Sequence, residues 1–308
     1  MVAPKSRRAH DATLKTKGAI PKAPNATESL LLGAHMSISG GLAKALDHGH
    51  SIGCTAIQIF VKNNMQWFAK PLSEKELADY HAYPDKPLFI FGHTSYLINP
   101  AAKNSDFLDK SIRALTEELI RADQLGLPFL VLHPGAHLGH GEEVGLNRVV
   151  TSLDTVFRSL PKGQCKIALE ITAGQGTSLG HTFEHLAAII DRSKFPERLT
   201  TCLDTAHLFA AGFDISTDKG FWEMVKRFDR VIGRNRLAVW HLNDSKTVLG
   251  SQVDRHDHIG KGKIGLAPFQ EIIRSKEFTT IPKVLETPKK KDLKEDVENM
   301  GILRSFLL

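Results

Sequence analysis

Three features are scarce in this sequence of 308 residues. Cysteine occurs only three times, at scattered positions without a C-x-x-C pair, which argues against a disulfide framework and favours a reducing compartment. No apolar run approaches the roughly 18–20 residues that span a bilayer. The N-terminal region has no apolar segment of the kind that directs secretion. We therefore expect a cytoplasmic protein, in a bacterial cytosol or nucleoid, without a membrane partner.

Positive charge is concentrated at the N-terminus. The chain carries a net charge of +6, but residues 1–29 hold six Lys and Arg against two Asp and Glu, a net +4. The remainder is nearly balanced, so overall charge says little about nucleic acid as a partner. The segment lacks apolar periodicity, and we predict a disordered basic tail over 1–29. A solvated tail without a role, added phosphate affinity, and organellar or nuclear targeting all remain open.

From residue 30 onward, short apolar runs alternate with longer amphipathic stretches. Runs typical of buried parallel strands lie at 30–35, 56–61, 88–93, 129–133, 166–170, 200–204, 237–241 and 283–286. Helical patterns between them include 109–126, 147–163 and 183–192. Eight strands separated by helices over about 250 residues predict an α/β fold, a single-domain (β/α)₈ TIM barrel at 30–308. An open doubly wound sheet is the alternative.

Seven of the eight predicted strands end in an imidazole or a carboxylate. In FLVLHPGAH (129–137), for example, four apolar residues lead directly into His133. The full set of strand ends is His35, His93, His133, Glu170, Asp204, His241 and Glu286. One such histidine would be an ordinary cap, but active sites of TIM barrels lie at the carboxyl ends of the strands. We therefore expect these side chains to meet at one rim.

Further candidate ligands lie beside the strand ends. His207 follows Asp204 by one turn, and Asp254 and His256 lie two positions apart in HLNDSKTVLGSQVDRH (241–256). Imidazoles and carboxylates without cysteine suit zinc, manganese or related divalent ions. Carboxylates packed together without cations would have to take up protons. The ligands are too many for one ion; two ions would use most of them, and three would use all.

Other motifs have less weight. Gly260, Gly262 and Gly265 spell G-x-G-x-x-G but follow a polar run rather than a strand, which argues against a dinucleotide site. HTFEH (181–185) fits the inverted zinc-protease pattern H-x-x-E-H, yet a helix start is the simpler interpretation. His35 is either a ligand or a partner of a ligand. Surface positions are predicted for His48, His50, His137 and His140.

The sequence resembles the endonuclease IV family, the apurinic/apyrimidinic endonucleases of family 2, over residues 30–308. The resemblance rests on GAHMSISGGL (33–42), GHTSYLIN (92–99), LHPGAHLG (132–139), LEITAGQG (169–176), CLDTAH (202–207), the 241–256 motif and LETP (285–288). It implies a TIM barrel that hydrolyses the phosphodiester 5′ to abasic sites during base-excision repair. The products are a 3′-hydroxyl and a 5′-deoxyribose phosphate, and the implied partner of the monomeric enzyme is damaged double-stranded DNA.

The resemblance also assigns three zinc ions per chain, with manganese as an alternative at one site. The first zinc corresponds to His93, His133 and a bridging Glu170. The second corresponds to Glu170, Asp204, His241 and Glu286. The third corresponds to His207, Asp254 and His256. Glu170 and Glu286 are also assigned as catalytic, and metal-assisted phosphoryl transfer of this kind needs no nucleophilic side chain.

DNA contact is assigned by the resemblance to Met65, Tyr96 and Leu97, in loops that wedge into the minor groove. An abasic nucleotide flips out at little cost in stacking. Met65 stands where family members often carry arginine, so it can wedge but cannot bind phosphate. Ile171 and Ala206 replace polar or thiol residues common beside the ligands. These departures affect the expected lesion range and rate rather than metal binding.

Sugar isomerases and epimerases with the same barrel are the alternative. They keep a metal set like Glu170, Asp204, His241 and Glu286. They do not require the simultaneous presence of His93, His133, Asp254 and His256. A noncatalytic DNA-binding module has no need of nine convergent ligands, so the sequence favours the nuclease.

Overall fold

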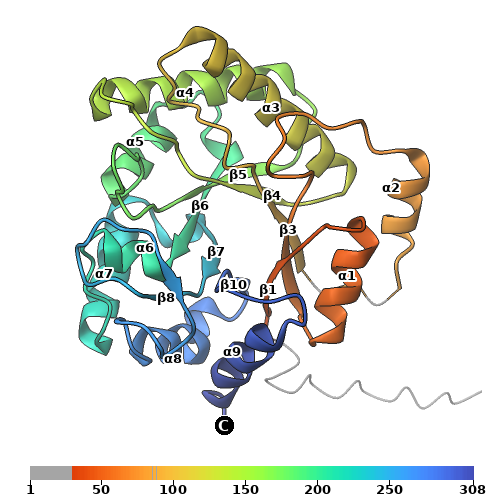
Figure 1. Cartoon of the computed structure of the whole chain (residues 1–308). Coiled ribbons are helices and arrows are strands. Elements are labelled where there is room, and N and C mark those ends of the chain that lie inside the picture. Colours follow the sequence, from red (N-terminus) through yellow and green to blue (C-terminus); the bar gives the residue numbers. More distant parts are fainter. Residues whose placement is uncertain (1–29, 85, 88) are drawn as a thin grey trace, which may run out of the picture.

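A closed barrel of eight parallel strands forms the centre of the protein (Figure 1). The computed structural model describes residues 30–84, 86–87 and 89–308; the predicted tail at 1–29 lies outside them. Neighbouring strands follow the order β1-β10-β7-β6-β5-β4-β3-β2. The predicted TIM barrel is confirmed, and the open sheet is excluded because β1 pairs with both β2 and β10.

All eight predicted strands form, with ends shifted by at most two residues. Their bounds are β1 Leu32–Met36, β2 Ala56–Phe60, β3 Phe89–His93, β4 Phe129–Leu132, β5 Lys166–Glu170, β6 Leu199–Asp204, β7 Leu237–His241 and β10 Lys283–Leu285. A small antiparallel ribbon of β8 (Asp244–Ser245) and β9 (His256–Asp257) lies outside the barrel. This ribbon folds the 241–256 motif back on itself, so that its two ends meet.

Helices surround the ring of strands (Figure 1). They are α1 Leu42–Ser51, α2 Glu74–His81, α3 Ser105–Gln124, α4 Glu142–Ser159, α5 Phe183–Arg192, α6 Thr205–Ala210, α7 Asp218–Val231, α8 Ala267–Arg274 and α9 Lys294–Ser305. Short 3₁₀ turns lie at Pro196–Arg198, Arg234–Arg236 and Lys276–Phe278. None of the helices in the described part of the chain is both long and apolar enough to cross a membrane.

Polar first turns explain why two helices begin earlier than the sequence pattern predicts. The predicted helix 183–192 is confirmed, but α3 and α4 begin four and five residues earlier than predicted. Asn104 starts α3, because its side chain accepts a hydrogen bond from the Phe107 amide at 3.0 Å. Beyond the end of α3, Gly126 adopts a left-handed φ of 69°. Polar first turns carry little apolar periodicity, so the sequence pattern starts late.

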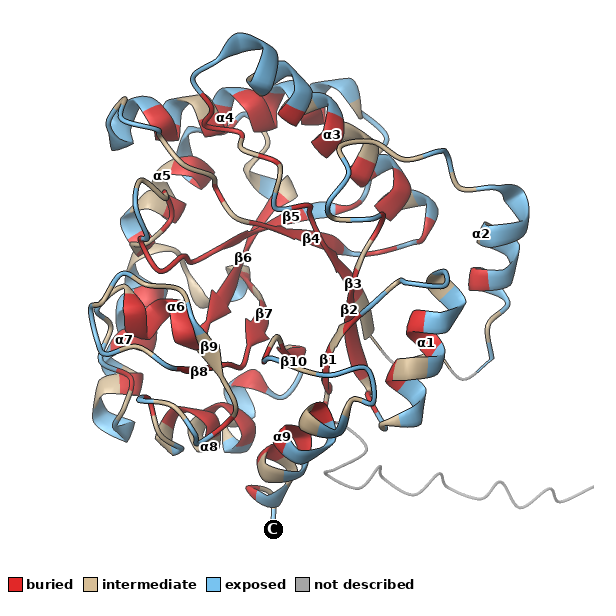
Figure 2. Ribbon diagram, viewed as in Figure 1, coloured by how far each residue is buried: buried red, intermediate tan, exposed pale blue. Residues whose placement is uncertain are grey.

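Two apolar layers hold the barrel together. Figure 2 shows buried strands and buried inner faces of the helices, with the outer helix faces exposed. The barrel interior contains Ala56, Phe91, Phe129, Val131, Ala168, Cys202, Val239 and Val284. A larger shell fills the space between strands and helices. Because both faces of each strand are covered, most strand residues are apolar, and the histidines and carboxylates of the strands lie at or beside their carboxyl ends.

Candidate metal centre

The carboxyl end of the barrel brings together all nine predicted metal ligands, here called the mouth cluster. Those that end a strand or directly follow one are His93, His133, Glu170, Asp204, His241 and Glu286. Asp204 also caps α6, because its carboxylate accepts a hydrogen bond from the His207 amide at 3.0 Å. The cap holds His207 one turn into the helix. Asp254 and His256 reach the same rim from the β8–β9 ribbon and the loop before it.

Glu170 joins two groups of histidines through its two carboxylate oxygens. Its Oε2 lies 3.3 Å from His93 Nε2 and 2.9 Å from His133 Nε2. Its Oε1 lies 2.9 Å from His241 Nδ1 and 3.3 Å from His207 Nδ1. Burial would raise the pKa of Glu170, but the surrounding histidines hold it well below its usual range. A charged carboxylate with partners on both oxygens is suited to bridge two cations.

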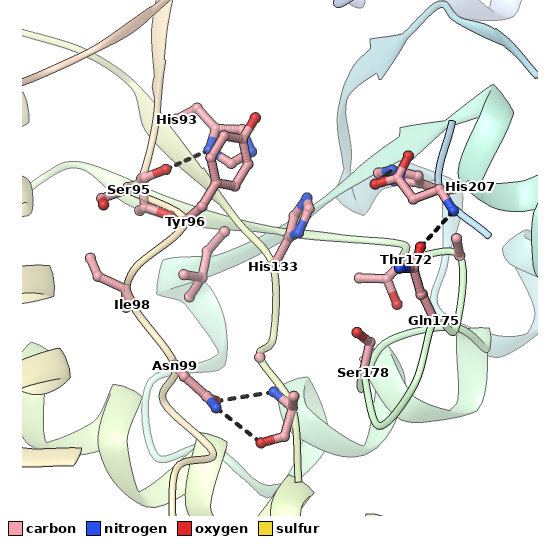
Figure 3. Close-up of a pocket in the computed structure, with 16 residues that line it drawn as sticks. His93, Ser95, Tyr96, Ile98, Asn99, His133, Thr172, Gln175, Ser178 and His207 are labelled. Carbon is pink, nitrogen blue, oxygen red and sulfur yellow. Dashed lines mark hydrogen bonds and ion pairs between the residues drawn. The ribbon is translucent and has the colours of Figure 1, made fainter. Parts of the chain in front are cut away.

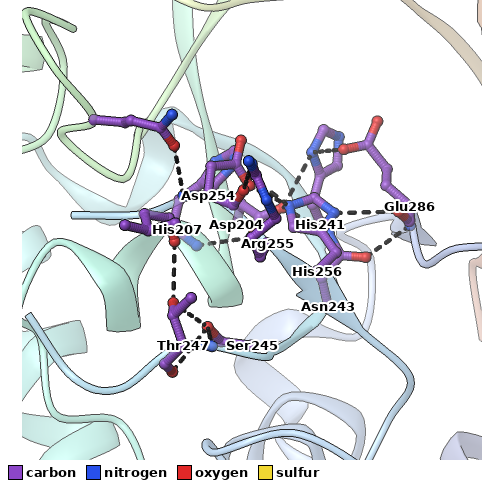
Figure 4. Close-up of polar contacts among 12 residues, drawn as sticks. Asp204, His207, His241, Asn243, Ser245, Thr247, Asp254, Arg255, His256 and Glu286 are labelled. Carbon is purple, nitrogen blue, oxygen red and sulfur yellow. Dashed lines mark hydrogen bonds and ion pairs between the residues drawn. The ribbon is translucent and has the colours of Figure 1, made fainter. Parts of the chain in front are cut away.

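A second group surrounds His241 (Figure 4). Its Nδ1 lies 3.2 Å from Glu286 Oε2 and 3.8 Å from Asp204 Oδ2. Asn243 fixes both carboxylate residues: its Nδ2 donates to Asp204 Oδ2 at 2.6 Å, and its Oδ1 accepts from the Glu286 amide at 2.8 Å. The four candidate ligands of this group lie within 4.8 Å of one another, counted between one ligand atom of each: Glu170, Asp204, His241 and Glu286.

Asp254 lies between two histidines in the third group. Its Oδ2 is 3.2 Å from His207 Nε2, and its Oδ1 is 3.2 Å from His256 Nε2. The two imidazole nitrogens are 3.4 Å apart. Asp204 Oδ2 is 3.7 Å from His256 Nε2, so this carboxylate is within reach of both the second and the third group.

Hydrogen bonds behind the rings direct lone pairs into the site. Each of His93, His207 and His256 directs Nδ1 to a backbone carbonyl oxygen, at 2.7, 2.9 and 3.1 Å respectively. A ring nitrogen that faces a carbonyl carries the proton, so Nε2 of the neutral ring presents its lone pair. That lone pair faces carboxylate oxygens, and the two repel unless a proton or a metal ion lies between them. The donor set therefore fits divalent cations.

Gln58 orients His241 in the same way, although it was not predicted. This buried amide donates from Nε2 to Glu286 Oε1 at 2.5 Å, so its Oε1 accepts from His241 Nε2 at 2.9 Å. His241 then presents the lone pair of Nδ1 to the carboxylates. The same amide nitrogen lies 2.9 Å from His35 Nδ1, which places His35 behind the ligands. In the sequence, the feature that could have pointed to Gln58 was a glutamine inside the apolar run AIQIFV.

The carboxylates favour the charged form of the histidines. Burial would lower the pKa of His256, but the carboxylates of Asp204 and Asp254 outweigh burial and raise it to about 9. Burial would also lower the pKa values of the other two rings, but Asp204, Asp254 and Glu170 raise that of His207, and Cys202, Glu286 and Glu170 raise that of His241, well above the ordinary value. An incoming metal ion must therefore displace protons from these rings.

An open cavity of about 260 Å³ lies beside the first group, lined by residues that include His93, His133 and Tyr96. The Tyr96 ring lies 5.1 Å from the His93 ring and 5.7 Å from the His133 ring, measured between centroids (Figure 3). Tyr96 is 58% exposed and Met65 is 74% exposed, while Leu97 is half-buried. Two of the three residues predicted to contact DNA thus present much of their surface to solvent.

The glycine-rich loop binds a carboxylate of its own chain. The amides of Gly260, Gly262 and Ile264 each donate to the buried side chain of Asp244 at 3.0 Å. A Cβ at position 262 would lie 2.4 Å from the Ser245 carbonyl oxygen, so glycine is required there. The loop therefore closes the β8–β9 ribbon, in agreement with the rejection of a dinucleotide site.

The HTFEH segment begins a helix, as predicted. Thr182 caps α5 and accepts a hydrogen bond from the His185 amide at 3.2 Å. Glu184, which would be the catalytic base of a peptidase, instead pairs with Arg227 at 3.0 Å. His181 and His185 face Glu142 and are compared with the mouth cluster below. The other histidines predicted at the surface lie in the last turn of α1 (His48, His50) and in the loop before α4 (His137, His140).

Similarity to known proteins defines first a class and then a family. Residues 46–305 match a family described as xylose isomerase-like TIM barrel. Proteins named probable endonuclease 4 from Geobacter sulfurreducens and Chloroflexus aurantiacus are 48% and 45% identical, covering 90% and 89% of this chain and 94% and 97% of theirs. The crystal structure of endonuclease IV from Thermus thermophilus superposes with a TM-score of 0.79 at 33% identity, covering 90% of this chain and 98% of that chain. The chain therefore belongs to the endonuclease IV family of apurinic/apyrimidinic endonucleases, hydrolases of DNA repair.

The barrel itself is shared more widely. A D-tagatose 3-epimerase-like protein superposes with a TM-score of 0.70 at 20% identity, covering 90% of this chain and 97% of that chain. At this level of identity the similarity concerns the fold alone. Family membership therefore rests on the endonuclease relatives.

Proposed function

We propose that this apurinic/apyrimidinic endonuclease holds three zinc ions in the mouth cluster and cuts the phosphodiester 5′ to an abasic site. The first ion would be held by His93, His133 and Glu170. The second would be held by Glu170, Asp204, His241 and Glu286, and the third by His207, Asp254 and His256. The observation that carries the proposal is the convergence of inward-facing ring nitrogens on shared carboxylates. Manganese remains an alternative at one site.

When bound, the ions would supply Lewis acidity to the phosphate and a source of hydroxide at neutral pH. The chain keeps the ligands in place. Glu170 contacts histidines of separate groups through separate oxygens. Glu286 is fixed by Gln58 at its side chain and by Asn243 at its backbone amide. Glu170 and Glu286 are the proposed catalytic residues because they would touch the first and second ions.

Damaged double-stranded DNA is the proposed partner. Tyr96 and Met65 present exposed side chains, and Tyr96 lines the cavity beside the proposed first zinc site. An abasic nucleotide has no base to unstack, so it can leave the helix at a low energetic cost. Apolar side chains such as Met65 and Leu97 can fill the gap that remains. We further propose that the enzyme is a monomer and acts in the cytoplasm.

A synthetic duplex with one tetrahydrofuran abasic analogue tests the proposal. Purified enzyme without added magnesium should make one cut 5′ to the analogue and leave an end that a DNA polymerase extends. The undamaged duplex is the control and should remain intact. Absence of cleavage after zinc has been restored, together with conversion of a ketohexose, would instead support a sugar epimerase.

A further inference from the structure

Two loops that carry the proposed DNA contacts rest on one helix. Met65 lies in the loop between β2 and α2, and Tyr96 and Leu97 lie in the loop between β3 and α3. Helix α3 contacts the backbone of both loops through side chains of one segment. The contacts centre on Glu118, which is 1% exposed.

Glu118 forms a buried ion pair with Lys62. Lys62 Nζ lies 2.9 Å from Glu118 Oε1, and both side chains are 1% exposed. The same ammonium donates to the Gln66 carbonyl oxygen at 2.5 Å. Glu118 Oε2 accepts a hydrogen bond from the Ser95 amide at 3.1 Å. The cation of this ion pair, Lys62, therefore binds the backbone of the first loop. The anion, Glu118, binds the backbone of the second loop.

Ser95 connects the two loops directly. Its hydroxyl donates to the Asn64 carbonyl oxygen at 2.6 Å and accepts from the Leu97 amide at 3.2 Å. Asn64 is the neighbour of Met65, and Ser95 is the neighbour of Tyr96. The exposed side chains are thus one residue away from the bonds that link their loops.

Neighbouring residues of α3 bind the flanks of the first loop. Glu117 Oε1 accepts from the Ala69 amide at 2.9 Å, and Arg121 Nε donates to the Val61 carbonyl oxygen at 2.8 Å. Both ends of the loop are therefore anchored without Lys62. The ion pair therefore acts on the segment between these two anchored ends, which contains Met65.

We propose that Lys62 and Glu118 form a brace that keeps the Met65 loop in register with the Tyr96–Leu97 loop, so that both enter the damaged duplex together. A buried ion pair is weak evidence for a role in stability, because apolar replacements are often neutral or stabilising. Here the two charges bind the backbones of loops that are separate in sequence, a task that apolar side chains cannot perform. The inference rests on the proposed function, and both residues are positioning residues.

The test compares the wild type with the double variant Lys62→Met, Glu118→Gln. This variant removes both charges together, keeps a similar volume, and leaves an amide oxygen for the Ser95 amide. We expect the KM for abasic duplex to rise at least about tenfold while kcat stays within about threefold, as for the loss of uniform binding. Zinc content should be unchanged. Fluorescence of 2-aminopurine beside the abasic site should show less unstacking at equal protein concentration.

Leu115→Ala is the matched control, since Leu115 is a buried residue of α3 that packs in the apolar shell. It should lower thermal stability without a comparable rise in KM. An equal rise in the control, or an unchanged KM in the double variant, would overturn the brace. If the double variant does not fold, Glu118→Gln alone replaces it and should raise KM by about threefold; an unchanged KM there would also overturn the inference. A wild type that leaves the abasic duplex uncut would refute the proposed function instead.

Discussion

Two clusters of histidine and carboxylate in this protein differ in what lies behind the rings. One is the mouth cluster at the barrel end. The other, here called the outer cluster, consists of Glu142 at the start of α4 and of His181 and His185 beside the start of α5. Both contain at least one group of three or more ligand atoms that lie within 4.8 Å of one another. Proximity of ligand atoms therefore does not distinguish them.

Ring protonation distinguishes them at His185, whereas His181 directs Nδ1 to the Ser178 carbonyl oxygen at 3.2 Å, as the mouth rings do. In the outer cluster, His185 Nδ1 accepts a hydrogen bond from the Gly180 amide at 3.3 Å, so the neutral ring carries its proton on Nε2. That nitrogen lies 3.3 Å from Glu142 Oε2, where it donates an ordinary hydrogen bond. Burial and His181 lower the pKa of His185, whereas the mouth carboxylates raise the pKa of His256. We therefore expect the mouth cluster to bind metal and the outer cluster to join two helices.

The largest expected effect concerns the shared carboxylate. Glu170→Gln should lower cleavage of abasic duplex by roughly 10⁴-fold or more, because loss of a cation at the phosphate removes several kcal/mol of transition-state stabilisation. Zinc content should fall as well. The corresponding change in the outer cluster, Glu142→Gln, should alter neither quantity. Steady-state kinetics and elemental analysis of both variants check this contrast, and equal losses would contradict it.

The pH dependence of zinc binding is the next effect in size. In metal-free protein His256 has a pKa of about 9, so below that pH zinc must displace a proton to bind the third group. Affinity should therefore rise with pH by about tenfold per unit for each displaced proton, and hence by about 100-fold or more between pH 7 and pH 9, since His207 of the same group also has a raised pKa. Titration with zinc in a weakly buffered solution should release protons. A pH-independent affinity would argue against zinc at His256.

Gln58→Leu should have an intermediate effect. It removes the acceptor that holds the tautomer of His241 and the donor that holds Glu286. Changes of this kind typically reduce metal affinity or activity by about 10- to 100-fold. Competition with a chromogenic chelator measures the affinity. Unchanged zinc affinity and turnover would mean that His241 is oriented by its other contacts alone.

The smallest effect is expected for Tyr96, beside the mouth cluster. Tyr96→Ala should weaken binding to abasic duplex by about tenfold, because an aromatic ring at an unstacked step contributes on the order of 1–3 kcal/mol. Zinc content should not change, since Tyr96 packs against the rings of His93 and His133 without a polar contact to either. Equilibrium binding at fixed salt checks the affinity. A loss of zinc with normal DNA affinity would assign Tyr96 to the metal centre.

The sequence predicted the barrel and the nine converging residues because both follow from short-range pattern. Buried parallel strands are apolar runs, and their carboxyl ends share one rim in this fold. What holds the ligands in place depends on contacts distant in sequence. Gln58 reaches Glu286 from β2, and Lys62 in the loop after β2 meets Glu118 of α3. Such pairs leave no local pattern beyond an isolated polar residue near or within an apolar run.

Counting zinc tests the central contrast most directly. Elemental analysis should find close to three ions in the wild type and about two in the double variant Asp254→Ala, His256→Ala, since these residues supply two of the third site's proposed protein ligands. The double variant His181→Ala, His185→Ala should keep three. The account would be contradicted if the first variant kept its full zinc content, or if the second lost an ion.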